Sequence, residues 1–336
     1  MPVIIASEEI HPFLPSLASG AAIERERAAK QDIRPMEFVI LNLMADKVAT
    51  ERQLALWLGN TTLQVRLTFA ATDSYVQGIA NGRDSKNTPV EHIRKFYKAW
   101  SDIRHRKFDG LIVTGVNALQ PRVSDEAIWG EVTQILDWST TNVLSSLFLC
   151  WGAQAALKHF HDVESIKGDQ KIFGLFDHQG LADKAGLLFG FPDVFPVPVS
   201  RWRTPDPVAL AAHPEIEHVA ISDEGGTNIL AETAPYDEGL FYPKRLYVLN
   251  HPEYEAGTLK GEYMRDSAAN PATPLPRHYF PGDDPAREPL NSWRHTAHLY
   301  TNWVKSIYEA TPYDLDEVPR PFRASSLSLQ AKAIAS

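Results

Sequence analysis

The chain has 336 residues, of which 44% are hydrophobic and 22% charged, and its formal net charge at pH 7 is −9. These proportions are typical of a folded globular protein, and the acidic balance argues against a nucleic-acid partner because phosphate binding needs a basic stripe. The single cysteine excludes an internal disulfide and a multi-cysteine zinc site, and no apolar run approaches the ~18 residues needed to span a membrane. We therefore expect a cytoplasmic protein with no membrane partner.

The sequence pattern divides the chain into three regions. Residues 1–35 are polar and mixed and are interpreted as an N-terminal arm, 36–318 as the folded domain, and 319–336 as a flexible tail. In the first half, short apolar runs predict buried strands at 36–43, 65–69, 108–115 and 143–149. Helical spacing and helix-end signals predict helices at 51–58, 90–104 and 125–139. The Gly-, Asn- and Asp-rich segment 73–88 is interpreted as a loop.

The second half of the chain is less regular. Its predicted elements are strands near 194–199, 218–222 and 246–249 and a helix at 293–308. Strands that alternate with helices predict an α/β fold, in which a doubly wound, mostly parallel sheet carries helices on both faces. Ligands of such sheets bind beyond the carboxyl ends of the strands. We therefore expect the functional site near Thr114-Gly115 and Cys150, which lie at the carboxyl ends of two predicted strands.

Cys150 stands between a predicted strand and the helical segment that begins at Trp151. A nucleophile at such a turn projects above the sheet, and the Trp151 amide at the helix N-terminus can donate to an oxyanion. The same position lowers the pKa of a thiol. A lone cysteine is also commonly a small buried hydrophobic residue, so this segment alone leaves both interpretations open.

A second predicted strand ends in Asn250-His251-Pro252-Glu253. A thiolate nucleophile needs a base, and the base needs a carboxylate to orient its second ring nitrogen. A His-x-Glu sequence at a strand end supplies both groups from one loop. Taken with the Cys150 turn, it predicts a catalytic triad of Cys150, His251 and Glu253.

The Cys-x-Gly turn and the distant His-x-Glu resemble class I glutamine amidotransferases. The rest of the chain is similar to the homoserine O-acyltransferase family, usually described as homoserine O-succinyltransferase, which begins methionine synthesis. The matching segments are Ile33-Arg34-Pro35, Leu41-Asn42-Leu43-Met44, Asn87-Thr88-Pro89, Glu91-His92, 108–115, Cys150-Trp151, 154–157, His251-Pro252-Glu253-Tyr254, Ser292-Trp293-Arg294, Thr301-Asn302-Trp303 and 311–315.

This resemblance implies a flavodoxin-like sheet with a C-terminal helical extension. It implies a ping-pong reaction in which Cys150 takes an acyl group from acyl-CoA, either succinyl-CoA or acetyl-CoA, and passes it to the hydroxyl of L-homoserine. His251 would deprotonate that hydroxyl, Glu253 would orient His251, and no cofactor would be bound permanently. The family pattern also implies a homodimer, and it places substrate-binding roles on Lys171, Ser200, Arg201, Glu262 and Arg265.

The chain departs from the family pattern beside these motifs. Leu119 occupies the position where glycine accompanies succinyl transfer and glutamate accompanies acetyl transfer. Because glutamate is absent, this position favours succinyl. Further departures, which leave serine or another hydroxy amino acid open as the acceptor, are Met44-Ala45, an insertion near 76–83, Val199 and Asn250.

Two other functions remain open at this stage. The triad would also serve a glutaminase-like hydrolase or amidotransferase, and the chain could be a catalytically silent binding relative. No metal site is expected, since His159 and His161 show no partners in the sequence and are interpreted as a helix-surface pair.

Overall fold

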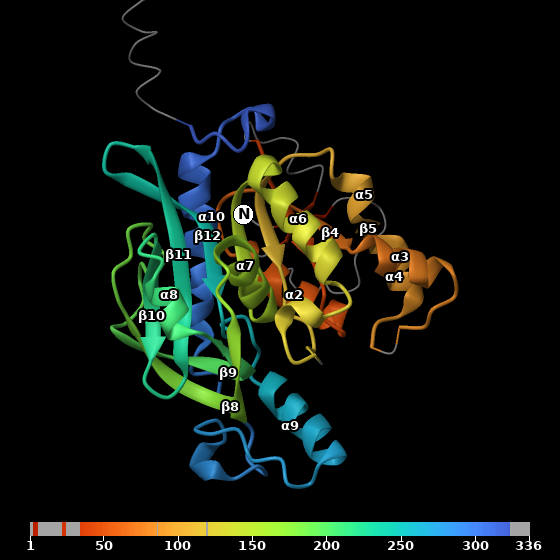
Figure 1. Cartoon of the computed structure of the whole chain (residues 1–336), viewed down its shortest axis with the longest axis vertical. Helices are drawn as coiled ribbons and strands as arrows, with labels where there is room; N and C mark the ends of the chain where they lie inside the picture. Colours follow the sequence, from red (N-terminus) through yellow and green to blue (C-terminus); the bar gives the residue numbers. More distant parts are fainter. Residues whose placement is uncertain (1–2, 6–21, 25–33, 86, 119, 323–336) are drawn as a thin grey trace, which may run out of the picture.

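The computed structural model describes residues 3–5, 22–24, 34–85, 87–118 and 120–322. Over these residues, twelve strands form one mixed sheet in the order β2-β1-β4-β3-β6-β7-β12-β11-β10-β8-β9, with β5 paired to β4 (Figure 1). The strands are β1 Val3–Ile5, β2 Ala22–Glu24, β3 Met36–Leu41, β4 Val65–Ala71, β5 Tyr97–Ala99, β6 Phe108–Val113, β7 Val143–Leu149, β8 Ser165–Gly180, β9 Val194–Pro205, β10 Ile216–Ser222, β11 Gly226–Asp237 and β12 Leu240–Val248.

Helices cover this sheet and extend beyond it. The α-helices are α2 Lys47–Leu58, α3 Asp73–Ala80, α4 Val90–Phe96, α5 Trp100–Ile103, α6 Trp129–Asn142, α7 Trp151–His161, α8 Pro207–Ala211, α9 Thr258–Ala269 and α10 His298–Ala310. Short 3-10 helices are η2 Val123–Asp125, η3 Pro281–Asp283, η4 Arg294–Ala297 and η5 Leu315–Glu317.

The central strands β3, β6 and β7 are buried along their whole length. Alternate side chains of β3 enter different hydrophobic clusters. Phe38 and Ile40 pack with residues of α2 and α10, whereas Val39 and Leu41 pack with residues of α6 and α7. Because both faces are covered, the strands are buried throughout and mostly apolar, rather than alternating between apolar and exposed polar residues. The predicted α/β fold with a largely parallel sheet is confirmed.

The second half of the chain adds an antiparallel extension to the parallel strands. β12 pairs in parallel with β7, and its other edge continues antiparallel through β11, β10, β8 and β9. In Figure 1 these strands stand at the left, and α9 lies below them. The parallel ladder between β7 and β12 is the feature that positions the site, because both strands end at the same edge.

Several segments differ from the predicted elements. The predicted loop 73–88 contains the helix α3, which begins with Asp73, an acid that stabilises a helix N-terminus. The predicted helix 90–104 is interrupted by β5, because Tyr97 pairs with Phe69 of β4. Residues 3–5 and 22–24 of the expected N-terminal arm form β1 and β2 at the edge of the sheet; most of the expected tail lies outside the described residues.

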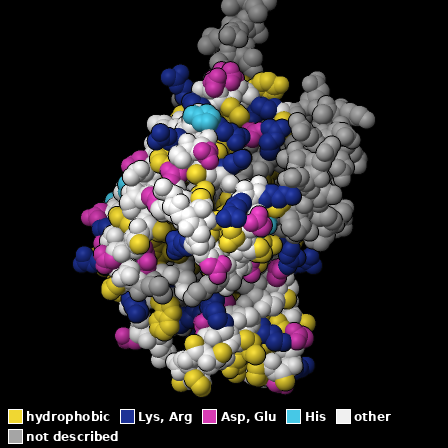
Figure 2. All heavy atoms as spheres, turned by 90° about the vertical axis from the view of Figure 1, so that its right-hand side faces the viewer, with side chains coloured by type: hydrophobic (Ala, Val, Ile, Leu, Met, Phe, Trp, Pro, Cys, Tyr) yellow, Lys and Arg dark blue, Asp and Glu magenta, His cyan; other side chains and the backbone are white. Residues whose placement is uncertain are grey.

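The surface carries charges of both signs. On the face shown in Figure 2, Lys and Arg side chains are interspersed with Asp and Glu side chains, unlike the basic stripe of a nucleic-acid-binding protein. Among the described residues, no helix combines the length and the apolar character that crossing a membrane requires.

Candidate active site

Cys150 occupies a sharp turn between β7 and α7. Its backbone has φ +49° and ψ −110°, and a positive φ is strained for a residue with a side chain. Its N–H donates to the carbonyl of Val248 at 2.7 Å, so the turn is bonded to β12. Two residues on, a Cβ atom at Gly152 would lie 2.6 Å from the carbonyl oxygen of Val113. Only glycine permits this approach of α7 to β6, and the approach fixes Cys150 above the sheet.

The end of β6 forms one wall beside the thiol. A Cβ atom at Gly115 would lie 3.3 Å from Cβ of Cys150 and 3.7 Å from the backbone nitrogen of Trp151. The Trp151 amide belongs to the first turn of α7, where backbone N–H groups have no intrahelical acceptor and the helix dipole favours negative charge. The glycine leaves space beside the thiol and the amide, and this geometry suits an oxyanion.

His251 and Glu253 lie together in the loop that follows β12. Nδ1 of His251 is 2.7 Å from Oε1 of Glu253, and both residues are buried. The ring of His251 stacks on that of Tyr254, with centroids 4.1 Å apart and planes inclined by 18°. The stacking and the carboxylate fix the orientation of the imidazole, as a general base requires.

The pKa of His251 is raised well above its ordinary value. Burial by itself would lower that pKa, but the negative charges of Glu253 and Cys150 and the hydrogen bonds to both outweigh burial. The imidazole is therefore a strong proton acceptor placed between a thiol and a carboxylate.

Tyr300 of α10 completes the support of the carboxylate. Its hydroxyl donates to Oε2 of Glu253 at 3.0 Å, so the two oxygens of Glu253 bind different partners. Tyr300 is fully buried in the hydrophobic cluster between α10 and the sheet. The C-terminal helix thus contacts the triad directly, which the sequence did not predict.

A second polar network adjoins the triad through Tyr254. The Tyr254 hydroxyl donates to Oε1 of Glu262 at 2.7 Å, and the Ser200 hydroxyl donates to Oε2. Nζ of Lys171 lies 3.4 Å from that same Oε2 and 3.0 Å from Oδ2 of Asp266. Segments far apart in sequence (β8, β9 and α9) meet here, next to the ring that stacks on His251.

Arg201 lies in a buried chain of hydrogen bonds on the β9 side. Its guanidinium donates to Oδ1 of Asn250 and to the carbonyl of Gly225. Burial lowers the pKa of Arg201 to about 10, while the negative charge of Cys150 acts in the opposite direction. The amide of Asn250 lies 3.0 Å from Nε2 of His178, whose Nδ1 lies 2.8 Å from the carbonyl of Phe176. Arg201 is thus a fixed cation close to the thiol.

The structure brings most of the predicted site residues together. Cys150, His251 and Glu253 form one group with the Trp151 amide, and Lys171, Ser200 and Glu262 form the adjoining network. Arg265, in contrast, has a 67% exposed side chain and pairs with Asp266 at 2.8 Å. Leu119 lies outside the described residues. Sequence reasoning missed Tyr254, Tyr300, Asn250 and His178 as site residues, although Tyr254 and Asn250 flank the His-x-Glu sequence.

The two histidines near the end of α7 are not alike. His159 lies 2.7 Å from Asp137 of α6. His161 has an 8% exposed side chain and lies 2.8 Å from Glu232 and 3.5 Å from Glu215. The expectation that the two histidines lack partners is therefore corrected for both. The partners of His161 come from β11 and from the segment before β10, which are remote in sequence.

The chain is similar to known proteins over most of its length. Residues 7–313 match the family model described as homoserine O-succinyltransferase. The chain is 42% identical over 301 residues to the homoserine O-acetyltransferase of Chelativorans sp. (strain BNC1), covering 89% of this chain and 91% of that protein. It is 41% identical over 316 residues to the homoserine O-acetyltransferase of Agrobacterium fabrum, covering 94% and 97%. A glutamine amidotransferase structure from Thermotoga maritima matches with 13% identity and a TM-score of 0.47, over 82% of this chain and 97% of that one.

Proposed function

Since the chain belongs to the homoserine O-succinyltransferase family, we propose that this homoserine O-acyltransferase works by a ping-pong mechanism through a thioester on Cys150. The observation that carries the proposal is the contiguous group of Cys150, His251 and Glu253 at the ends of two paired strands. Acyl-CoA is then a co-substrate.

In the first half-reaction, Sγ of Cys150 attacks the carbonyl carbon of the acyl-CoA thioester. The raised pKa of His251 supports transfer of the thiol proton to the imidazole. The tetrahedral oxyanion accepts from the Trp151 amide at the N-terminus of α7. The bond to the CoA sulfur breaks, His251 returns the proton to that sulfur, and free CoA leaves.

In the second half-reaction, the acceptor hydroxyl attacks the Cys150 thioester. His251 takes the hydroxyl proton, and Glu253 stabilises the imidazolium that forms. Collapse of the intermediate releases the O-acyl product and regenerates the thiolate. Water is not a reactant here, and it would hydrolyse the thioester if it reached it. The acceptor must therefore exclude water from the thioester when it fills the site.

The amino-acid part of the acceptor is proposed to bind at the network beside Tyr254. Glu262 is a carboxylate that can face an ammonium group, and Lys171 is a cation 3.4 Å from it. Arg265 on α9 has an exposed guanidinium that can take a carboxylate bidentately after releasing Asp266. L-homoserine is the proposed acceptor; serine or another hydroxy amino acid is the alternative.

Acetyl-CoA is the proposed donor. The two relatives above carry the acetyltransferase name and cover about nine-tenths or more of this chain. The succinyl preference expected from Leu119 rests on the absence of glutamate at a single position. The proposed donor, acetyl-CoA, therefore differs from the succinyl-CoA expected from Leu119, and the assay below distinguishes the two.

The test is intact-protein mass spectrometry with each donor separately, followed by each acceptor. With acetyl-CoA we expect a mass gain equal to one acetyl group and release of CoA, and discharge of the adduct by homoserine faster than by serine. Cys150→Ala should form no adduct and release no CoA. A Cys150→Ala variant with full turnover would refute the mechanism, and faster acylation by succinyl-CoA would reverse the donor assignment.

The glutaminase-like alternative predicts the opposite result in the same assay. Glutamine would yield ammonia in a Cys150-dependent manner, and neither acyl-CoA would release CoA. A silent relative would leave Cys150 unreactive toward both donors and toward iodoacetamide. The homodimer expected from the family is a separate proposal, which light scattering of the intact chain tests by its molar mass.

A further inference from the structure

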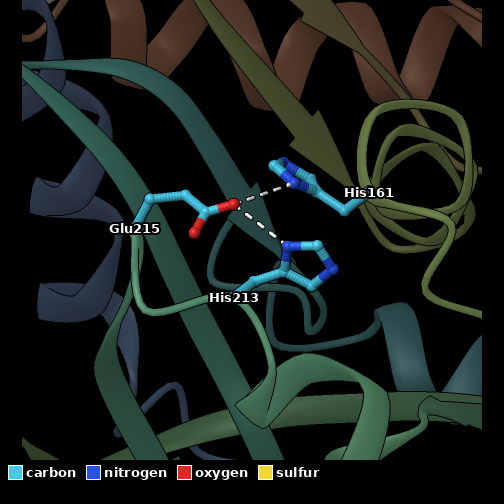
Figure 3. Close-up of side chains that lie close together, drawn as sticks. All are labelled: His161, His213 and Glu215. Carbon is cyan, nitrogen blue, oxygen red and sulfur yellow. Dashed lines mark hydrogen bonds and ion pairs between the residues drawn. The ribbon is translucent and has the colours of Figure 1, made fainter.

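The C-terminal end of α7 carries a cluster of side chains that the reaction does not use. His161 is the last residue of α7, and His213 and Glu215 lie between α8 and β10. Figure 3 shows the three side chains pointing toward one another, with one potential ligand atom of each within 4.8 Å of the others. Cys150 stands at the opposite end of this 11-residue helix, about 16 Å away along its axis. The cluster is therefore separate from the active site.

The spacing of the cluster fits a small tetrahedral cation. Oε1 of Glu215 lies 3.0 Å from Nδ1 of His213 and 3.5 Å from Nδ1 of His161. Ligand atoms bound to zinc at 2.0–2.1 Å in a tetrahedron stand about 3.3 Å apart. The carboxylate oxygen is thus already close to the spacing of two edges of such a tetrahedron, and the two histidine ligand atoms lie within 4.8 Å of one another.

Glu232 supports His161 on the side away from Glu215. Nε2 of His161 lies 2.8 Å from Oε1 of Glu232, which also accepts from the Tyr247 hydroxyl, while Arg245 donates to Oε2 at 2.8 Å. This carboxylate–histidine arrangement is the usual support of a metal-binding imidazole.

The other ring nitrogen of His161 faces the open side of the cluster. Nδ1 of His161 lies 3.5 Å from the Glu215 carboxylate oxygen, so it is directed at the place where a cation would lie. The C-terminal end of α7 adds negative potential at the same place. Solvent reaches the cluster, since the side chains of His213 and Glu215 are 28% and 51% exposed.

We propose that His161, His213 and Glu215 bind one zinc ion, with a water molecule in the fourth position. Two imidazoles and a carboxylate form a ligand set that zinc accepts, and the open fourth position is typical of three-ligand sites. The bound ion joins the end of the cysteine-bearing helix to the segment that leads into β10. This proposal does not depend on the acyltransferase function.

The experiment uses the full chain with Cys150→Ser, because an active-site thiolate beside a histidine could itself bind zinc. After treatment with a chelator, the protein is titrated with Zn²⁺ by calorimetry and with Co²⁺ by visible absorbance. We expect one ion per chain, the strong visible bands of tetrahedral Co²⁺, and a Tm that rises with Zn²⁺. His213→Ala and Glu215→Gln should each weaken binding at least tenfold. Glu232→Gln should weaken it by about 10- to 100-fold through His161.

The matched control is His159→Ala. His159 lies in the same turn of α7 as His161, but it pairs with Asp137 and not with the cluster. This variant should bind zinc as the parent does. Absence of one-to-one binding, or unchanged binding in His213→Ala and Glu215→Gln, would overturn the proposal.

Discussion

At the residue scale, Tyr300 is a side chain that acts on the triad without touching the thiol. Its hydroxyl donates to the Glu253 oxygen that His251 does not use. Tyr300→Phe keeps the ring and removes this bond, so Glu253 orients His251 less firmly. A hydrogen bond to a charged group contributes about 1.5 kcal/mol or more. We expect kcat to fall roughly tenfold, with KM for the acceptor unchanged.

Steady-state kinetics with each substrate varied would check this prediction. Tyr308→Phe on the same helix is the control, because Tyr308 is 45% exposed, and it should keep full activity. A Tyr300→Phe enzyme that altered KM alone would show that the hydroxyl serves substrate binding instead.

His178 makes stability depend on pH. Burial lowers its pKa from 6.5 to about 4, assisted by the charge of Arg201 and opposed by the bond to Phe176. The unfolded chain therefore binds the proton first as the pH falls, and the folded state loses stability between pH 6.5 and 4. By pH 5 this loss is about 2 kcal/mol.

His178→Asn removes this titration while leaving a donor for Phe176. Urea unfolding of both proteins at pH 7.5 and pH 5 is the measurement. The variant should have a lower free energy of unfolding than the parent at pH 7.5. This difference should shrink as the pH falls, because only the parent has a buried histidine that must stay uncharged, and it loses stability on acidification. An equal loss on acidification in both proteins would rule out His178 as the source.

At the element scale, the junction of β6 and α7 depends on Gly152. A methyl group there would lie 2.6 Å from the carbonyl oxygen of Val113 and 2.9 Å from that of Thr114. These are backbone atoms, which cannot move away by changing a side-chain rotamer. Gly152→Ala should therefore destabilise the fold by about 1–3 kcal/mol. It should also displace the Cys150 turn and reduce acylation further than stability alone explains. Gly130 of α6 is the control, since a Cβ there meets nothing within 4 Å.

Thermal unfolding and the rate of acyl-enzyme formation test this pair. Gly130→Ala should leave the rate of acyl-enzyme formation unchanged. Its stability should equal that of the parent or exceed it by up to about 1 kcal/mol, because alanine favours the helix. If Gly152→Ala acylated at the parental rate, the close approach of α7 to β6 would not be what positions Cys150.

The elements differ in how well the sequence predicted them. The strands β3, β6 and β7 are buried throughout and mostly apolar because helices cover both faces, and such runs are visible in a sequence. β8 and β11 were missed, since exposed polar residues fill much of β8, and its pairing with β9 is set by tertiary contacts. β5 was missed for a related reason, because its pairing with β4 overrides the helical spacing around it.

At the scale of the whole molecule, Asp109 joins three distant parts of the chain. This fully buried carboxylate accepts two bonds at 2.9 Å from Arg34, one at 2.7 Å from the amide of Glu37, and one from the Thr311 hydroxyl. Asp109→Asn would leave the Arg34 charge without its partner. We expect a loss of roughly 3 kcal/mol in the free energy of unfolding.

Denaturant unfolding at neutral pH measures this loss. The control is Glu91→Gln, which breaks an exposed pair with Arg94 and should change stability by less than about 0.5 kcal/mol. A similarly small effect at Asp109 would mean that the three segments are held by apolar packing alone.

The site as a whole was predictable only in part. The sequence predicted Cys150, His251 and Glu253 as one group because they follow strand ends and their chemistry is complementary, and the structure brings them together. Tyr300 and His178 were not, because a buried tyrosine or histidine in an apolar segment carries no local sign of its polar partner. His161 was misjudged for the same reason, since Glu232 and Glu215 are distant in sequence.

The pairing of β7 with β12 has a consequence for how the catalytic group can move. Leu149 is aligned with Val248, and the Cys150 amide donates to the Val248 carbonyl. The proposed nucleophile is therefore bonded directly to the strand that leads to the proposed base, His251. In hydrogen–deuterium exchange, the Cys150 amide should rank among the slowest in the chain, exchanging only when the core unfolds. Amides on α9, which carries Glu262 and Arg265 and in which Leu259 is the buried residue, should exchange earlier. The half of the site proposed to make and break bonds thus lies on the central sheet, while the half proposed to hold the acceptor lies on a largely solvent-facing helix.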